Sequence, residues 1–405
     1  MPRAGSRGLF STLALNMTAE NTPQPGPIGI NLSDPIFRGR YHGTQRHQDD
    51  LEDVVGRARQ VGCKKLIVTG SDFQSAHDGL DLAKQFPGTC FATAGIHPCS
   101  SSIFSGREDH AEHTASCDPD PSAPVSEDIL PDPEQSAKLI SKLTDLILEA
   151  RPWADKGLVA FGEFGLDYDR LHYCNKRLQL HSFEAQLKVA ASLQPQLPLF
   201  LHSRAAHGDL VALLKAAFGE RLEKLEKGGV VHSFTGTIEE ATELAELGLH
   251  IGINGCSLKT EENCAVVKAV PLDRIMLETD GPWCEVRPSH EGWKYLVEKK
   301  QQQQQPPETA EPVSNGAPAE DAGHQRRPRK QQNGKQKKEP EVASRFEVVK
   351  KEKWKKGAMV KGRNEPCTIE RVAQIVAAIK GVSVEELCEA SWMNTVSVFG
   401  LDDTS

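Results

Sequence analysis

The 405-residue sequence lacks any hydrophobic run long enough to cross a membrane, and no apolar stretch of the secretory-signal kind follows its start. A membrane-spanning helix needs about 20 mainly apolar residues, so neither a membrane protein nor a secreted precursor is expected. Aromatic residues are scarce at 6%, and apolar residues reach only 38%. Two long stretches with few core-forming residues account for that low share. The remainder has the composition of an ordinary globular protein.

Closely spaced cysteine pairs are also missing. The ten cysteines are scattered from Cys63 to Cys388 without a CxxC pair, and a chain of this size needs no disulfides to fold. Reduced thiols in an intracellular protein, cytoplasmic and/or nuclear, are therefore expected. We predict that segment 1–26 is a disordered tail. It contains Arg3 and Arg7 and no acidic residue before position 20, so a mitochondrial transit peptide is the alternative interpretation.

An excess of positive charge is absent as well, since the formal net charge is -8. An acidic protein has no overall electrostatic attraction for nucleic acid. Any binding of a polyanion must then depend on a local basic patch or on bound metal ions.

Short apolar runs alternate with longer amphipathic stretches over positions 27–405, an arrangement typical of a parallel sheet wound with helices. Single α/β barrels routinely reach about 250 residues, so one large domain accommodates the whole pattern. We therefore predict an α/β protein with a (β/α)8 TIM barrel. The eight predicted strands are Ile28–Asn31, Lys65–Thr69, Cys90–Ala94, Val159–Gly162, Leu199–His202, Val230–His232, His250–Ile253 and Ile275–Glu278.

The amphipathic stretches between the strands are predicted to form helices, and two more helices are predicted near the end of the chain, with Val, Ile and Leu at helical spacing. In one helix Thr237 precedes two acidic residues, as expected at a helix N-terminus. The predicted helices include Asp49–Gln60, Phe73–Gln85, Glu134–Glu149, Lys176–Leu193, Ala206–Phe218, Ile238–Leu247, Thr368–Ile379 and Ser383–Ser397.

Two segments interrupt the alternation and are predicted to be disordered insertions. The first, about 100–134, is rich in Ser, Asp, Glu and Pro and follows the third strand. The second, about 299–340, begins with five glutamines and ends in a basic run. That basic run is interpreted either as a solvated linker or as a nucleic-acid-binding or nuclear-targeting segment.

Side chains able to bind metal ions follow four of the predicted strands. Glu163, His202, His232 and Asp280 stand at the carboxyl ends of strands four, five, six and eight, and that end of a TIM barrel carries the active site. Imidazole and carboxylate are the ligands of Zn²⁺, Mn²⁺ or Mg²⁺ in hydrolytic centres. Such an ion lowers the pKa of water, and a carboxylate such as Asp280 takes the proton. No organic cofactor is needed.

Each of these residues alone has a structural explanation, because a single histidine at a strand end is usually a hydrogen-bonded structural residue. Four ligand-type side chains at one end of the barrel favour a metal site instead. Nearby groups suit an anionic substrate. Arg204 lies two residues beyond His202 and offers a phosphate contact, with a surface ion pair as its alternative role. His97 is placed to donate to a leaving oxygen.

The motifs that carry these residues resemble those of the TatD-type metal-dependent deoxyribonucleases, within the amidohydrolase-like barrels. The resemblance runs from Ile28 to about Phe399, apart from the two insertions. Its motifs, in order, are Ile28-Gly29-Ile30-Asn31-Leu32, Ala94-Gly95-Ile96-His97-Pro98, Gly162-Glu163-Phe164-Gly165-Leu166-Asp167, Leu201-His202-Ser203-Arg204, His232-Ser233-Phe234-Thr235-Gly236, Leu277-Glu278-Thr279-Asp280-Gly281-Pro282 and Arg363-Asn364-Glu365-Pro366.

The resemblance implies that Glu163, His202, His232 and Asp280 bind metal, with Asp280 and Glu163 as the catalytic residues. It also implies that the motif beginning at Arg363 forms a loop over the barrel mouth.

One motif departs from the pattern of many members of that family. Many of them end strand one with a His-x-His pair that completes a second metal site, whereas this chain has Asn31-Leu32-Ser33-Asp34. The branch with such a sequence resembles TatD itself and its eukaryotic relatives. Oxygen ligands from Asn31 and Asp34 favour Mg²⁺ or Mn²⁺ over Zn²⁺, with one or two ions bound. Asn31 is assigned to substrate binding together with Arg204 and His97.

Three functions are compatible with these residues. The first, implied by the resemblance, is metal-dependent hydrolysis of phosphodiester bonds in DNA, as a 3′-5′ exonuclease on single strands. The second keeps the metal barrel but assigns it an ester, amide or lactone substrate, because one fold hosts many reactions. The third is a non-catalytic scaffold whose basic segment recruits partners.

Overall fold

The computed structural model describes residues 28–106, 121–151, 157–297, 342 and 344–401. The predicted tail, the transit-peptide alternative and the glutamine-rich insertion lie outside these residues. The helices in the described part of the chain include none that is long and apolar enough to span a membrane.

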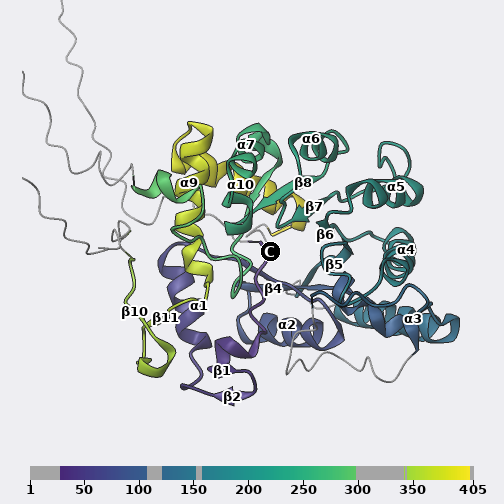
Figure 1. Ribbon diagram of the computed structural model, residues 1–405, viewed down its shortest axis with the longest axis horizontal. Coiled ribbons are helices and arrows are strands. Elements are labelled where there is room, and N and C mark those ends of the chain that lie inside the picture. Colours follow the sequence, from purple (N-terminus) through teal and green to yellow (C-terminus); the bar gives the residue numbers. More distant parts are fainter. Residues whose placement is uncertain (1–27, 107–120, 152–156, 298–341, 343, 402–405) are drawn as a thin grey trace, which may run out of the picture.

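The centre of the molecule is a curled parallel sheet with helices around its outside (Figure 1). Its seven strands are hydrogen-bonded in chain order, and most of their residues are buried. A parallel sheet with both faces covered has this near-continuous apolar sequence. The strands are β3 (Leu66–Val68), β4 (Cys90–Ala94), β5 (Leu158–Asp167), β6 (Leu199–Arg204), β7 (Gly229–His232), β8 (His250–Ile253) and β9 (Ile275–Leu277).

The segment at Ile28 closes the sheet into a barrel and takes the place of the eighth strand. Ile28 forms a parallel bridge to Glu278, and Ile30 forms one to Val68. Only these two bridges form, so the predicted strand Ile28–Asn31 is not a continuous ladder. Gly29 between them has a φ of 68°, which interrupts an extended strand. The predicted TIM-barrel architecture is confirmed.

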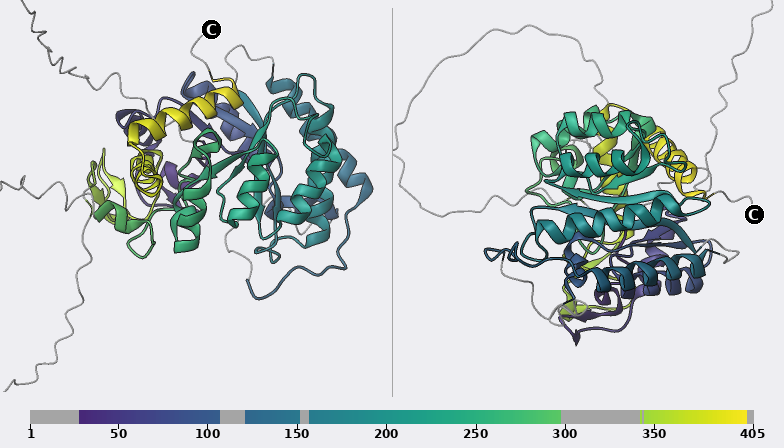
Figure 2. Two further views of the ribbon diagram at one scale, coloured as in Figure 1. Left: turned by 90° about the horizontal axis from the view of Figure 1, so that it is seen from above. Right: turned by 90° about the vertical axis from the view of Figure 1, so that its right-hand side faces the viewer.

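Most predicted helices are present with ends shifted by a few residues, and they surround the barrel in all three views (Figures 1 and 2). A short helix between β8 and β9, capped by Thr260, was not among the predicted ones. The helices are α1 (Leu51–Gln60), α2 (Phe73–Gln85), α3 (Pro133–Ala150), α4 (Lys176–Ser192), α5 (His207–Phe218), α6 (Ile238–Glu246), α7 (Glu261–Ala269), α9 (Ile369–Lys380) and α10 (Val384–Phe399).

Several short elements join this framework, and none was expected from the sequence. In the described ranges they comprise two small sheets and six short 3-10 helices. The sheets pair β1 (Arg40–Tyr41) with β2 (Thr44–Gln45), and β10 (Val348–Val349) with β11 (Met359–Val360). The 3-10 helices are η1 (Pro35–Arg38), η2 (Pro98–Ser105), η4 (Gly255–Leu258), η5 (Leu272–Arg274), η6 (Lys351–Lys353) and η7 (Pro366–Thr368).

The acidic insertion is shorter than predicted. Its expected start at about residue 100 falls within η2, where Phe104 is fully buried. At its other end, the amide nitrogen of Asn175 donates to the carbonyl oxygens of Ser126 at 2.6 Å and Ile129 at 3.0 Å. Residues 121–134 are therefore tied to the start of α4. Positions 107–120 lie outside the described part of the chain.

The barrel interior is filled by apolar side chains at the amino-terminal end of the strands. Ile67, Phe91, Val159 and Phe200 form this layer together with residues of other strands. Phe399, at the end of α10, packs against it. A TIM barrel is a packed core and not a pore, and the predicted metal ligands lie at the opposite, carboxyl-terminal end of the strands.

Four buried charges attach the chain after β11 to α1. The Arg363 guanidinium bonds both oxygens of Asp50, at 2.9 and 2.6 Å, and Glu365 at 2.8 Å. Arg57 on α1 bonds both oxygens of Glu365, at 2.8 and 3.2 Å. All four residues are at most 2% exposed. Two positive and two negative charges balance in this network, as buried ions require.

Replacing Arg363 with methionine is expected to lower the free energy of unfolding by about 3–5 kcal/mol, because the substitution leaves buried carboxylates without their partner. The matched control is Arg345→Met, which breaks a largely exposed contact with Glu370 and is expected to cost at most about 1 kcal/mol. Urea unfolding followed by circular dichroism measures both losses. Similar losses in the two variants would contradict a structural role for the buried network.

Candidate active site

Strand β5 continues past its predicted end and carries Glu163 within it, not after it. The pairing of β5 with β6 shifts between Gly162 and Phe164, so Glu163 has no partner in the ladder. A bulge of this kind redirects a side chain. Here it accompanies the placement of the Glu163 carboxylate at the carboxyl-terminal end of the barrel, among residues that follow the neighbouring strands.

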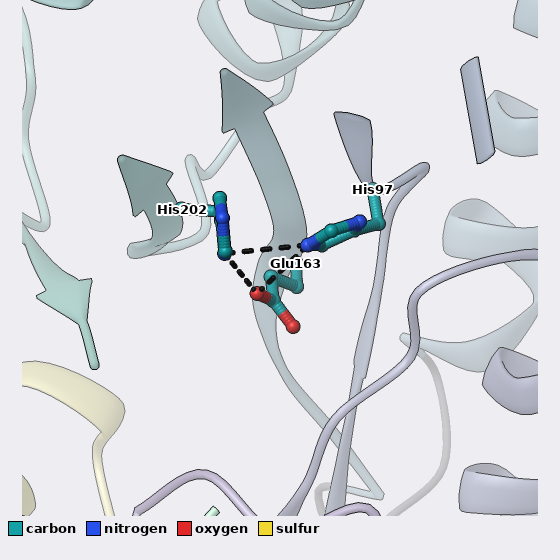
Figure 3. A group of neighbouring side chains, drawn as sticks. All are labelled: His97, Glu163 and His202. Carbon is teal, nitrogen blue, oxygen red and sulfur yellow. Dashed lines mark hydrogen bonds and ion pairs between the residues drawn. The ribbon is translucent and has the colours of Figure 1, made fainter. Parts of the chain in front are cut away.

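One oxygen of Glu163 is the centre of the site. Its Oε1 lies 2.8 Å from His202 Nδ1, 3.5 Å from His97 Nε2 and 3.5 Å from His232 Nε2. Figure 3 shows the carboxylate on β5 with the rings of His97 and His202 directed toward it. Burial would raise the pKa of Glu163, but the three imidazoles outweigh it and lower the pKa below its usual range. Glu163 is therefore an ionised carboxylate.

His202 is held between two carboxylates. Its Nε2 lies 3.0 Å from Asp167 Oδ2, at the end of β5, and its Nδ1 faces Glu163. Burial would lower the pKa of His202, but Asp167 and Glu163 raise it. When Nε2 donates its proton to Asp167, the Nδ1 lone pair points into the site. Histidine ligands of metal ions commonly have such a carboxylate behind them.

His232 has the same arrangement with its ring nitrogens exchanged. Its Nδ1 lies 2.8 Å from Glu278 Oε2, and its Nε2 faces Glu163 and lies 3.9 Å from Asp280 Oδ1. Glu278 is fully buried and accepts from the backbone nitrogen of Ser233 at 3.1 Å. Against the effect of burial, Glu278, Glu163 and Asp280 raise the pKa of His232 to about 10. The carboxylates around this ring therefore favour positive charge in the pocket.

His97 presents a proton to the site. Its Nδ1 accepts a hydrogen bond from the Cys99 backbone nitrogen at 3.1 Å, so in the neutral ring the proton must be on Nε2. Burial lowers the pKa of His97 to about 3, which keeps the ring neutral. The Nε2 proton faces Glu163 and His202. By proximity alone, His97, Glu163 and His202 form a candidate metal group, with donor atoms within 4.8 Å of one another. The Cys99 bond instead favours His97 as a donor.

Asp280 lies on the loop after β9 and is oriented by two donors. The Asn31 amide donates to its Oδ1 at 2.9 Å, and the Cys284 thiol donates to its Oδ2 at 3.2 Å. Burial, together with Glu163 and Glu278, raises the pKa of Asp280 to about 6, although His232 opposes the shift. Asn31, predicted to bind substrate, thus holds the position of a predicted metal ligand.

The motif beginning at Arg363 packs against this loop as a buried segment. Arg363, Asn364 and Glu365 are all at most 3% exposed. The Asn364 amide nitrogen donates to the carbonyl oxygens of Thr279 at 2.8 Å and Trp283 at 2.7 Å. Both flank Asp280, so Asn364 fixes the backbone that carries it.

Backbone strain is concentrated at the same end of the barrel. Ala205, Ser233 and Asp280 follow β6, β7 and β9, and they have φ values of 50°, 51° and 51°. This left-handed conformation costs a non-glycine residue roughly 1–3 kcal/mol, and strained residues of this kind gather at functional sites. The turns after these three strands are thus shaped to direct side chains into the barrel mouth.

Arg204 lies at the end of β6, at the edge of this group. Its Nη2 donates to the Ser233 carbonyl oxygen at 3.5 Å, and its buried Nε has no hydrogen-bond partner among the described residues. No acidic side chain in the described ranges forms an ion pair with Arg204, so the surface ion pair weighed from the sequence is not seen. Its guanidinium retains donors for a ligand.

The four predicted ligands fit a divalent cation. Glu163 and Asp280 contribute oxygens, and His202 and His232 contribute ring nitrogens backed by Asp167 and Glu278. This nitrogen and oxygen set suits Zn²⁺, Mn²⁺ or Mg²⁺. The raised pKa values of both imidazoles show that the pocket attracts positive charge. Fold and site together define the class of metal-dependent hydrolases built on a TIM barrel.

Comparison with known proteins identifies the family. The family model described as TatD related DNase matches residues 41–400. The chain belongs to this family and is a hydrolase acting on ester bonds. The non-catalytic scaffold weighed from the sequence is thereby set aside.

Individual relatives agree with this membership. The chain is 39% identical to deoxyribonuclease Tat-D of Schizosaccharomyces pombe over 92% of its own length and 94% of that protein. A crystal structure of an uncharacterized amidohydrolase from Saccharomyces cerevisiae is 31% identical, with a TM-score of 0.71 over 93% of this chain and 99% of that one. The 3′-5′ ssDNA/RNA exonuclease TatD of Erwinia tasmaniensis is 32% identical over 63% of this chain and 79% of that protein.

Sequence reasoning missed three residues that organise the site: Asp167, Glu278 and Asn364. A signal was present for two of them. Asp167 lies four residues after Glu163 on the same strand, and Glu278 lies two residues before Asp280. The role of Asn364 had no local signal, because it depends on contacts with residues more than 80 positions away.

Replacing Asp167 with asparagine is expected to weaken Mn²⁺ binding about 10- to 100-fold, because a neutral amide supports the basicity of His202 less well than a carboxylate. Isothermal titration of the purified protein with Mn²⁺ measures the change. The control is Asp81→Asn, which alters an exposed aspartate on α2 that is paired with Lys84. Unchanged Mn²⁺ affinity in Asp167→Asn would show that this carboxylate does not orient a ligand.

Proposed function

We propose that the protein is a metal-dependent deoxyribonuclease that removes nucleotides from the 3′ end of single-stranded DNA. The observation that carries this proposal is the convergence of Glu163, His202, His232 and Asp280 at one end of the barrel, with a buried carboxylate behind each imidazole. The names of the fission-yeast and Erwinia relatives support DNA as the substrate and the 3′ end as the point of attack.

Each residue has a role that follows from its contacts. Glu163, His202, His232 and Asp280 would hold one or two ions, with Mg²⁺ or Mn²⁺ favoured over Zn²⁺ because the carboxylates of Glu163 and Asp280 supply oxygen ligands. When bound there, such an ion would neutralise charge on the phosphate and lower the pKa of the attacking water. Asp280 accepts the proton of that water, while Asn31 keeps its carboxylate oriented. Glu163 balances the charge of the surrounding imidazoles.

The substrate phosphate is recognised by two other groups. Arg204 offers guanidinium protons that no described acid occupies, and such protons match phosphate oxygens. His97 donates its Nε2 proton as a hydrogen bond to the leaving oxygen. The phosphodiester therefore accepts hydrogen bonds from both of these groups. These local contacts bind the substrate phosphate although the chain as a whole is negatively charged.

The proposal predicts digestion of single-stranded DNA that needs Mg²⁺ or Mn²⁺ and stops in EDTA. Glu163→Ala and Asp280→Ala are expected to lower kcat/KM by about 10²- to 10³-fold, the cost of removing a preorganised charge from an active site. Oligonucleotides labelled at the 3′ or the 5′ end show the direction of attack.

The matched control is Glu184→Ala, which removes an exposed carboxylate on α4 outside the barrel and is expected to leave the rate unchanged. Full activity in both site variants would overturn the proposal. Turnover of a small ester by a metal-loaded protein that cleaves no DNA would assign the same site to a different substrate.

Replacing His97 with asparagine separates its two candidate roles. The asparagine oxygen still accepts from the Cys99 nitrogen, but the Nε2 donor is lost. As a donor to the leaving oxygen, His97 is expected to contribute about 10²- to 10³-fold to kcat, with Mn²⁺ affinity unchanged. Titration with Mn²⁺ alongside the kinetics makes the test, and a large loss of Mn²⁺ affinity would make His97 a ligand instead.

A further inference from the structure

Trp283 is an exposed aromatic side chain beside the catalytic loop. It is 58% exposed, whereas the large aromatic side chains of the described core are buried. It lies three residues after Asp280, and its backbone nitrogen donates to the Asp280 carbonyl oxygen at 3.0 Å. Burial normally stabilises a tryptophan side chain, and Trp283 lacks this stabilisation. Its exposure beside Asp280 therefore indicates a role in binding a ligand.

The other described tryptophans are used in packing. Trp354 stacks on His47 with ring centroids 4.9 Å apart, and Trp293 lies under the Arg371 guanidinium. Trp392 packs against the apolar layer at the amino-terminal end of the barrel. Within the described part of the chain, no aromatic ring or cation lies against the Trp283 indole. Its indole face is therefore open to a ligand.

The backbone of Trp283 is rigidly mounted even though its side chain is exposed. The buried Asn364 amide bonds the Trp283 carbonyl oxygen at 2.7 Å and the Thr279 carbonyl oxygen at 2.8 Å. The same amide thus holds the two ends of the short turn that carries Asp280. Asp280 and Trp283 share one fixed stretch of backbone. This fixed backbone limits the conformational entropy that is lost when a ligand stacks on the Trp283 side chain.

We propose that Trp283 forms a nucleobase subsite, in which a base of the DNA chain next to the reacting phosphate stacks on the indole. The proposal rests on the nuclease activity proposed above. Stacking suits a single-stranded substrate because each base has a π face, so the contact is tolerant of sequence. It also supplies affinity that the net charge of -8 does not. In the interior of a duplex both faces of each base are covered by its stacked neighbours.

The test compares two substrates in two proteins. One substrate is a single-stranded oligonucleotide labelled at its 5′ end, and the other has abasic sites in place of its last nucleotides at the 3′ end. Stacking on an aromatic side chain accounts for about 5- to 150-fold in affinity per base. Trp283→Ala is therefore expected to raise KM on the normal oligonucleotide by that factor. On the abasic oligonucleotide, the KM of Trp283→Ala is expected to be nearly the same as that of the unaltered protein. The kcat of the variant is expected to change little on either substrate.

Two further variants control for indirect effects. Trp283→Phe keeps an aromatic face and is expected to restore most of the affinity. Met393→Ala removes an apolar side chain of similar exposure, 60%, from α10, a helix that packs at the opposite end of the barrel, and is expected to change nothing.

Equal KM increases on normal and abasic substrates in Trp283→Ala would overturn the nucleobase subsite, because the lost contact would then be to the sugar and phosphate. An unchanged KM on both substrates would overturn it as well. If the unaltered protein cleaves neither oligonucleotide with Mg²⁺ or Mn²⁺, the proposed nuclease function fails, which is a separate result from failure of the subsite.

Discussion

A buried carboxylate surrounded by imidazoles is the feature on which the rest of this structure depends. Glu163 Oε1 lies within 3.5 Å of nitrogen atoms of three histidines that come from different strand ends. A carboxylate at 6% exposure is costly unless nearby groups compensate its charge. These histidines must therefore lie at the same level of the barrel. The register of the parallel strands places them there.

The orientation of each imidazole depends on a further layer of buried acids. Asp167 and Glu278 are fully buried and contact the outer nitrogens of His202 and His232, while the Cys99 amide fixes the proton of His97 on its inner nitrogen. Three histidines of identical chemistry thus acquire different roles: two present lone pairs and one presents a proton. The difference comes from what lies behind each ring, because the groups in front of the rings are shared.

The sequence could predict the parts that depend on local pattern. Apolar runs of strand length predicted the barrel. Positions at the ends of these runs predicted Glu163, His202, His232 and Asp280 as site residues. Tertiary contacts decide the rest. A bulge extends β5 past Gly162, the left-handed Gly29 reduces the first strand to two bridges, and Arg363 is buried because Asp50 and Glu365 accompany it. Such pairings over long separations have no periodic signature in the sequence.

The last of these contacts also explains how the barrel accommodates a long insertion between β9 and α9. Asn364, which lies beyond the insertion, reaches back to Thr279 and Trp283, and Arg363 and Glu365 tie the same segment to α1. The entropy cost of closing a loop grows only slowly with its length, so these buried bonds can hold the returning chain whatever the insertion contains. The Asp280 loop is consequently fixed by residues on both sides of the insertion.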